Sequence, residues 1–144
     1  MNVLIVAGAA DTAGQGWRIV QAFRKHAPDW NVRSMAKDRQ FMAYEQDLPF
    51  RRKQLEELYQ ACDVIHVRNK FNLYDELAAK YGPKPVVIHY HGSLFRGNPQ
   101  YYLREQVKRD AVGIVSTLDL WLIAPELLTW LPAPYNVDEL EAMA

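Results

Sequence analysis

Short apolar runs alternate with amphipathic stretches along the chain. Residues 3–6 form a continuous run rich in β-branched side chains, which is typical of a strand buried on both faces. Similar runs predict four further strands, at residues 63–67, 85–90, 112–115 and 128–131. Residues 31–35, where apolar and polar side chains are mixed, carry a weaker strand signal. Between the runs, apolar side chains recur at helical spacing and predict helices at residues 19–27, 55–62 and 72–81. A proline suited to a first helical turn, Pro99, predicts a further helix at residues 99–109.

Strands that alternate with helices are typical of a parallel sheet with crossover helices on both faces. Because such crossovers are right-handed, we expect an α/β fold, a Rossmann-like three-layer α/β/α domain whose mostly parallel sheet has about six strands. The chain has 144 residues, which is the length of one domain. We place this domain at residues 1–131 and read residues 132–144 as a crossover segment and C-terminal tail.

Composition narrows the classes of partner and compartment. Lysine plus arginine and aspartate plus glutamate number 17 each, so the chain has no net field to attract nucleic acid or an anionic membrane. The single cysteine, Cys62, cannot form an internal disulfide. The N-terminus has no basic leader, and no apolar stretch approaches the roughly 20 residues that span a bilayer. We therefore expect a cytoplasmic protein without a transmembrane segment.

Ligands of open parallel sheets bind beyond the carboxyl ends of the strands. Residues that directly follow the predicted strands are therefore the candidate site. They are Gly8, Gly14, Gly16, Arg68, Asn69, His91, Gly92, Ser93, Ser116, Thr117 and Asn136.

Two of these segments have alternative interpretations. The small-residue loop at residues 8–16 either lets backbone N–H groups approach a phosphate or is simply a tight connection, since it lacks the G-x-G-x-x-G spacing. His89 and His91 share one face of a strand and either chelate a metal or make hydrogen bonds. A third ligand at suitable spacing is missing, so we predict no metal, with His91 as a polar contact to a ligand hydroxyl.

Other polar residues are read more simply. Arg96 either pairs with a phosphate or carboxylate or is a solvated surface residue. Ser116 lacks a G-x-S-x-G turn and is read as a hydrogen bonder, not a nucleophile. The mixed-charge runs 47–53 and 104–110 are read as solvated helix faces. Five aromatic residues are read as packing residues and not as sugar platforms: Tyr90, Tyr101, Tyr102, Trp121 and Trp130.

Five segments in this order resemble the N-terminal, acceptor-side domain of a GT-B glycosyltransferase, in particular glycosyltransferase family 4. They are MNVLIVAG, CDVIHVRN, KPVVIHYHGSLFR, AVGIVSTLDL and LPAPYNVDEL. The resemblance spans nearly the whole chain and implies transfer of a sugar from a nucleotide-activated donor. The nucleotide sugar is then a substrate, no cofactor or metal is implied, and the acceptor is a small molecule or glycan.

The resemblance also assigns roles to the candidate residues. Gly14 and Gly16, or Gly8, would approach the donor phosphate or the acceptor, and His91 would touch the transferred sugar. Ser116 and Thr117 would line the cleft, and Asn136 would mark passage into a second domain. The strand-end positions, and not the resemblance, add five further substrate-binding candidates: Arg68, Asn69, Gly92, Ser93 and Arg96. Because enzymes of this family hold the nucleotide mainly in that second domain, we expect a second donor-binding domain, a separate donor-binding chain or self-association, and little activity from this chain alone.

Three functions remain open. The chain is the acceptor side of a glycosyltransferase, a stand-alone binding or regulatory module that keeps the fold without transfer, or an unrelated Rossmann-like enzyme acting on a nucleotide or small phosphorylated ligand. Tight nucleotide binding by the isolated chain favours the third. Biological activity that survives His91→Ala favours the second.

Overall fold

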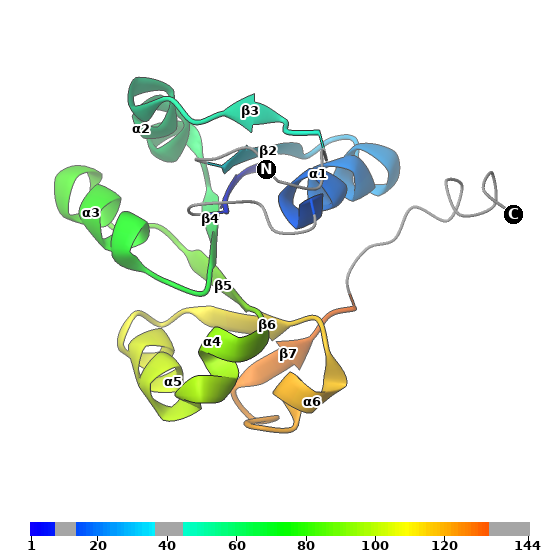
Figure 1. The fold of residues 1–144 in the computed structure, drawn as a ribbon. Helices are drawn as coiled ribbons and strands as arrows, with labels where there is room; N and C mark the ends of the chain where they lie inside the picture. Colours follow the sequence, from blue (N-terminus) through cyan, green and yellow to red (C-terminus); the bar gives the residue numbers. More distant parts are fainter. Residues whose placement is uncertain (8–13, 37–44, 133–144) are drawn as a thin grey trace, which may run out of the picture.

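One parallel sheet forms the centre of the protein (Figure 1). The computed structural model describes residues 1–7, 14–36 and 45–132. Within these residues the sheet has seven strands in the order β3-β2-β1-β4-β5-β6-β7, all of them parallel. The strands are β1 (Asn2–Val6), β2 (Asn31–Ala36), β3 (Leu48–Pro49), β4 (Val64–Arg68), β5 (Val86–Tyr90), β6 (Val112–Val115) and β7 (Leu128–Trp130).

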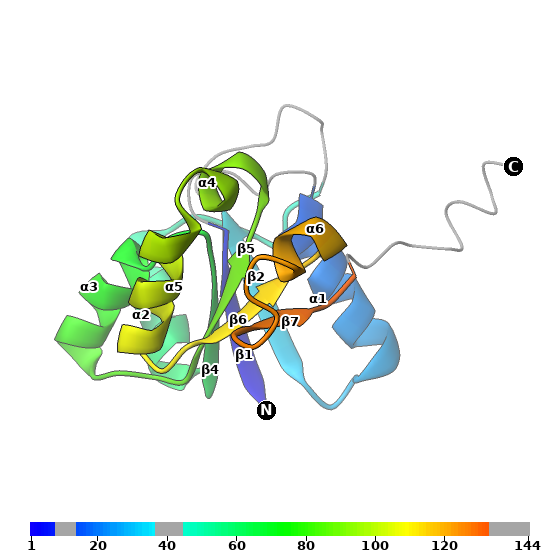
Figure 2. The ribbon, with the colours of Figure 1, turned by 90° about the horizontal axis from the view of Figure 1, so that it is seen from below.

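Helices cover both faces of this sheet, as Figure 2 shows. One face packs against α2, α3 and α5, with a core that includes Leu55, Leu77 and Leu103. The opposite face carries Ile5 and packs against α1, which contributes Val20. The helices are α1 (Gln15–His26), α2 (Arg52–Ala61), α3 (Asn72–Tyr81), α4 (Gly92–Gly97), α5 (Pro99–Lys108) and α6 (Leu118–Trp121).

The expected fold class is therefore confirmed: the chain is a Rossmann-like three-layer α/β/α domain. All six predicted strands are present, and β3 is the additional one. The two-residue strand β3 pairs with the end of β2 through Met35 and Leu48. Two short helices, α4 and α6, also went unpredicted. The predicted crossover segment lies almost wholly in residues 133–144, which are outside the described part of the chain.

The charged runs are less solvated than the sequence suggested. Asp47 is nearly buried, with 4% of its side chain exposed, and it accepts bonds from Arg33 and from the backbone N–H of Ser34. Arg109 is also largely buried, with 15% of its side chain exposed, and it pairs with Asp75. The reading of both runs as solvated helix faces was therefore wrong at these two positions, where a charge joins separate elements of the fold.

The aromatic predictions hold in part. Tyr90 is fully buried, and Tyr102 and Trp121 pack against the main core. Tyr101 and Trp130 are each 47% exposed, so they are only partly packed, and Tyr101 lies edge-on against Tyr102. Trp130 lies on β7, which among the described residues pairs with a strand on one side only.

Candidate functional site

The strand order reverses between β1 and β4, and the candidate site lies at the carboxyl edge of the sheet around this point. The chain moves from β1 to β2 on one side, whereas β4 is followed by β5 and β6 on the other. Connections that leave neighbouring strands in opposite directions open a crevice at such a point. Arg68 and Asn69 lie at the end of β4, and His91 directly follows β5.

Arg68 joins three elements at this edge. Its Nε donates to His91 Nε2 at 3.1 Å, and its Nη2 donates to Gln15 Oε1 at 3.3 Å. Gln15 is the first residue of α1, so the guanidinium connects the start of a helix with the ends of two strands. A planar guanidinium with several fixed N–H donors is suited to such bridging.

Asn69 fixes the backbone beside this arginine. Its φ of 56° is in the left-handed region, which asparagine tolerates better than most residues. Its backbone N–H donates to the carbonyl of His89 at 3.0 Å, and its Oδ1 accepts from the backbone N–H of His91 at 2.7 Å. These two bonds hold the ends of β4 and β5 together and position His91.

His91 is a neutral hydrogen-bond donor in this arrangement. Burial and the nearby charge of Arg68 lower its pKa to about 3, so the ring carries no charge at neutral pH. Because Nε2 accepts the bond from Arg68, the single ring proton lies on Nδ1. Through Nδ1–H the ring can donate to an oxygen such as a sugar hydroxyl, whereas its basic lone pair is already occupied.

Two further histidines lie behind His91 on the same face of the sheet. The His89 ring centroid is 4.0 Å from that of His91 and 5.5 Å from that of His66. Burial lowers the pKa of His66 to about 4 and that of His89 to about 2. His66 Nε2 and His89 Nδ1 are buried without a hydrogen-bond partner among the described residues.

The hydrogen-bonded interpretation of His89 is the one the structure shows. His89 Nε2 lies 2.6 Å from Ser116 Oγ, so this serine faces the column that His66, His89 and His91 form. Across residues 1–7, 14–36 and 45–132, no three His, Cys, Asp or Glu side chains gather in a way that could hold a metal ion.

Thr117 and Arg96 lie on the rim beyond β6. Thr117 precedes α6 and is exposed, and its side chain bonds to Asp119, which helps to lower the pKa of that carboxyl. Arg96 donates to Asp119 Oδ2 from Nε at 2.9 Å. Both partners are about half exposed, so Arg96 is a surface residue here with a carboxylate of the chain itself as partner.

The glycines of the site have different environments. Gly14 is the N-cap of α1 with φ 63°, and Gly92 begins α4 with φ 52°; both backbones are left-handed, which favours glycine. Gly16 is buried in the first turn of α1, whereas Ser93 is exposed on α4. Gly8 and Asn136 lie outside the described residues.

The structure therefore brings Arg68, Asn69 and His91 together. Ser116 is not in contact with this group but bonds to His89, which lies next to His91. Sequence reasoning missed Gln15, the second acceptor of Arg68. Its position directly after Gly14, at the carboxyl edge and at the start of a helix, was the available signal.

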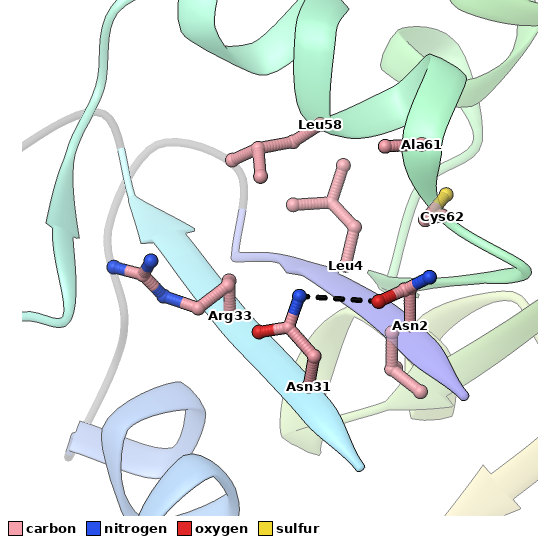
Figure 3. A pocket seen from close by; sticks show the side chains of 8 residues that line it. Asn2, Leu4, Asn31, Arg33, Leu58, Ala61 and Cys62 are labelled. Carbon is pink, nitrogen blue, oxygen red and sulfur yellow. Dashed lines mark hydrogen bonds between the residues drawn. The ribbon is translucent and has the colours of Figure 1, made fainter.

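A small hollow lies away from this edge, between α2 and the starts of β1 and β2 (Figure 3). Its volume is about 30 Å³, enough for groups the size of water. Asn31 Nδ2 donates to Asn2 Oδ1 at 3.1 Å across its mouth. Cys62 lines it, and burial raises the pKa of this thiol. The hollow is too small for a sugar or nucleotide and is part of the packing.

Comparisons with known proteins identify no family. No family model matches the chain, and no curated protein or solved structure does either. Among the helices of the described residues, none is both long and apolar enough to cross a bilayer.

Proposed function

We propose that this domain supplies the acceptor side of a sugar-transfer cleft, as the N-terminal domains of GT-B glycosyltransferases of family 4 do. The observation that carries the proposal is the contact of Arg68 with both His91 and Gln15, at the point where the strand order reverses. This contact gathers neutral and cationic hydrogen-bond donors at the edge where ligands of such folds bind.

The chemistry of these groups suits a nucleotide sugar. The Nδ1–H of neutral His91 would donate to a hydroxyl of the transferred sugar. The N-terminus of α1 has no acidic residue in its first turn, so its positive end and the guanidinium of Arg68 favour a phosphate oxygen nearby. In the reaction, the bond from the sugar to the donor phosphate breaks and a bond to the acceptor oxygen forms. The acceptor proton leaves with the nucleoside diphosphate.

A second domain or chain would complete the cleft by holding the nucleotide. The described site contributes one guanidinium at the crevice, whereas a nucleoside diphosphate carries several negative charges. We therefore expect this chain alone to bind sugars and nucleotide sugars weakly.

Saturation-transfer NMR on the intact chain tests this function, with UDP-glucose, GDP-mannose and simple methyl glycosides as probes. We expect weak saturation of sugar protons that is lost in His91→Ala. Arg68→Lys should weaken it strongly, because an ammonium cannot bond to His91 and Gln15 in the same planar geometry. Arg51→Ala, at an exposed arginine before α2, is the matched control and should change nothing. Saturation that is absent for every probe, or unchanged in His91→Ala, would contradict the proposal.

One observation favours a second candidate, a binding or regulatory module that performs no transfer. The lone pair of His91 is occupied by Arg68 and its pKa is low, so the residue provides binding without general-base chemistry. Under this alternative the chain still binds the methyl glycoside probes, yet no donor-binding partner restores transfer. Calorimetry with free nucleotides separates the remaining alternative, because tight binding without a sugar would indicate a nucleotide enzyme.

A further inference from the structure

Exposed apolar side chains are concentrated in one region of the protein. Most of the exposed large hydrophobic residues in the described part of the chain lie between Val107 and Leu131. This region comprises the end of α5, the strand β6, the short helix α6 and the edge strand β7, which lie together at one end of the sheet (Figure 1). Exposed apolar side chains that line a common groove in a folded protein commonly mark an interaction site.

A groove of about 450 Å³ runs through this region, between α5 and the turn at residues 123–127. Leu103 and Ala124 are buried and form its floor. Val107, which is 61% exposed, and Leu127, which is 40% exposed, form its apolar walls. The groove can therefore accept apolar side chains without first opening the core.

Gln106 holds the two walls of this groove in place. This buried residue of α5 donates from Nε2 to the carbonyl of Leu127 at 2.9 Å. On its other side, Gly113 of β6 lies so close that an added Cβ would overlap the Gln106 side chain. The bond between α5 and the turn, together with this close packing, gives the groove a fixed shape before any partner arrives.

The charges around the groove are asymmetric. Arg104 and Lys108 lie one turn apart on α5 and are exposed. Neither makes an ion pair with another residue of the described ranges. The facing wall carries a carboxylate, Glu126. A docked segment would therefore meet two cations along the α5 side and an anion on the other.

We propose that this groove docks an amphipathic α-helix of a partner protein, which places an apolar stripe against Val107 and Leu127 and an acidic flank beside Arg104 and Lys108. The length of α5 along the groove, from Gln100 to Lys108, is about 12 Å, which matches two turns of a partner helix. Apolar anchors at i, i+3 and i+7 on that helix fit this span.

This surface is separate from the sugar site. Because β6 follows α5 and all strands are parallel, α5 runs away from the carboxyl edge, and Val107 and Lys108 lie toward the opposite edge of the sheet. A helix in the groove would leave Arg68 and His91 accessible. The proposal therefore does not depend on what the carboxyl edge binds.

NMR titration of the ¹⁵N-labelled full chain provides the test. The probe is a synthetic helical peptide with leucines at i, i+3 and i+7 and glutamates along one flank, compared with the same peptide carrying lysines. We expect saturable shifts in α5 and residues 123–127 with the glutamate peptide only. The double variant R104E/K108E should weaken binding at least about fivefold, because two attractions become repulsions. Val107→Asp should abolish binding without affecting the fold, since this side chain is exposed.

Matched variants separate specific docking from general electrostatics. R51E/K53E makes the same change of charge at exposed residues near the start of α2 and should change the affinity less than twofold. His91→Ala should leave peptide binding intact. Three results would overturn the proposal: equal binding of the lysine peptide, a concentration-dependent dimer that Val107→Asp dissolves, or a large gain in peptide affinity after deletion of residues 133–144. The second would assign the groove to another copy of this chain, and the third to the chain's own tail.

Discussion

Asn69 shows how one residue serves both the backbone and the site. Its left-handed φ allows the chain to turn sharply after β4, and its Oδ1 then receives the backbone N–H of His91. A residue with neither property would both strain the turn and leave His91 without its backbone partner. The position of the His91 ring thus depends on Asn69, whose side chain bonds to the backbone of His91.

Substitutions at Asn69 separate these two contributions to stability. Asn69→Ala should lower the free energy of unfolding by about 2 kcal/mol, since it loses a hydrogen bond worth about 1 kcal/mol and forces alanine into the left-handed region at a similar cost. Asn69→Gly should lose only about half as much, because glycine adopts this φ readily. Urea denaturation measures both. A glycine variant as unstable as the alanine variant would contradict this division.

At the same scale, the sequence identified single residues of the site and not their contacts. Arg68, Asn69 and His91 were predicted because each follows a strand, and parallel strands end at one edge. The bond from Arg68 to His91 joins residues 23 positions apart, and the bond to Gln15 joins residues 53 apart. Side-chain rotamers and neighbouring bulk decide such pairings, and no local pattern encodes them.

At the scale of elements, Asp47 connects the edge of the sheet to the helix on its face. Its carboxylate receives Arg24 of α1 at 2.7 Å, Arg33 of β2 at 2.7 Å and the backbone N–H of Ser34 at 3.0 Å. These bonds hold the segment just before β3 against β2 and α1. They explain how a strand of only two residues keeps its place at the edge of the sheet.

Removal of this carboxylate should loosen the β2–β3 edge. Asp47→Ala leaves two arginines without a buried partner and should lower the free energy of unfolding by about 2–4 kcal/mol. Hydrogen exchange should rise at β2 and β3 first. The control is Asp119→Asn, at a pair with Arg96 in which both side chains are about half exposed; there the loss should stay below about 1 kcal/mol. If the free energy of unfolding decreased equally in both variants, the burial of Asp47 would not contribute to stability and the prediction would be wrong.

Elements of usual length were predictable, whereas the short ones were not. The strands β1, β4, β5 and β6 each contain an apolar run that marks them, whereas β2 mixes apolar residues with Arg33 and Ser34. The helices α1, α2 and α3 carry apolar stripes at helical spacing, and Pro99 marks the start of α5. The strand β3 contains only Leu48 and Pro49, and proline normally argues against a strand. The six residues of α4 begin and end with glycine. In both cases the surrounding fold overrides weak local preferences.

At the scale of the whole molecule, the two faces of the sheet differ in polarity. The face covered by α2, α3 and α5 has a continuous apolar core. The other face has a small apolar cluster under α1, and beside it the column of His66, His89 and His91. These three histidines are neutral in the folded chain and lie on the face that α1 covers. The free energy of unfolding should therefore depend on pH through this face of the sheet.

The buried histidines should make the protein less stable as the pH falls below about 6.5. Their pKa values in the folded chain are lowered to about 4, 2 and 3, whereas an unfolded histidine titrates near 6.5. Between these values the unfolded chain binds more protons than the folded one, so the free energy of unfolding decreases with falling pH. Each histidine contributes up to about 1.4 kcal/mol per pH unit, and its stabilisation is fully present only above about pH 6.5.

Urea denaturation between pH 7.5 and pH 5 isolates this effect from the acidic groups. The carboxyl of Glu56, whose pKa is lowered to about 2 by bonds from Tyr81, Arg52 and Lys80, contributes its own loss only below about pH 4.5. His66→Val removes a buried ring with an unpartnered nitrogen, and it should reduce the slope by up to about 1.4 kcal/mol per pH unit with little loss of stability at pH 7.5. If His66→Val leaves the change in the free energy of unfolding per pH unit unaltered, this prediction is wrong. The folded chain would then bind a proton at His66 as readily as the unfolded chain, which requires solvent to reach the ring.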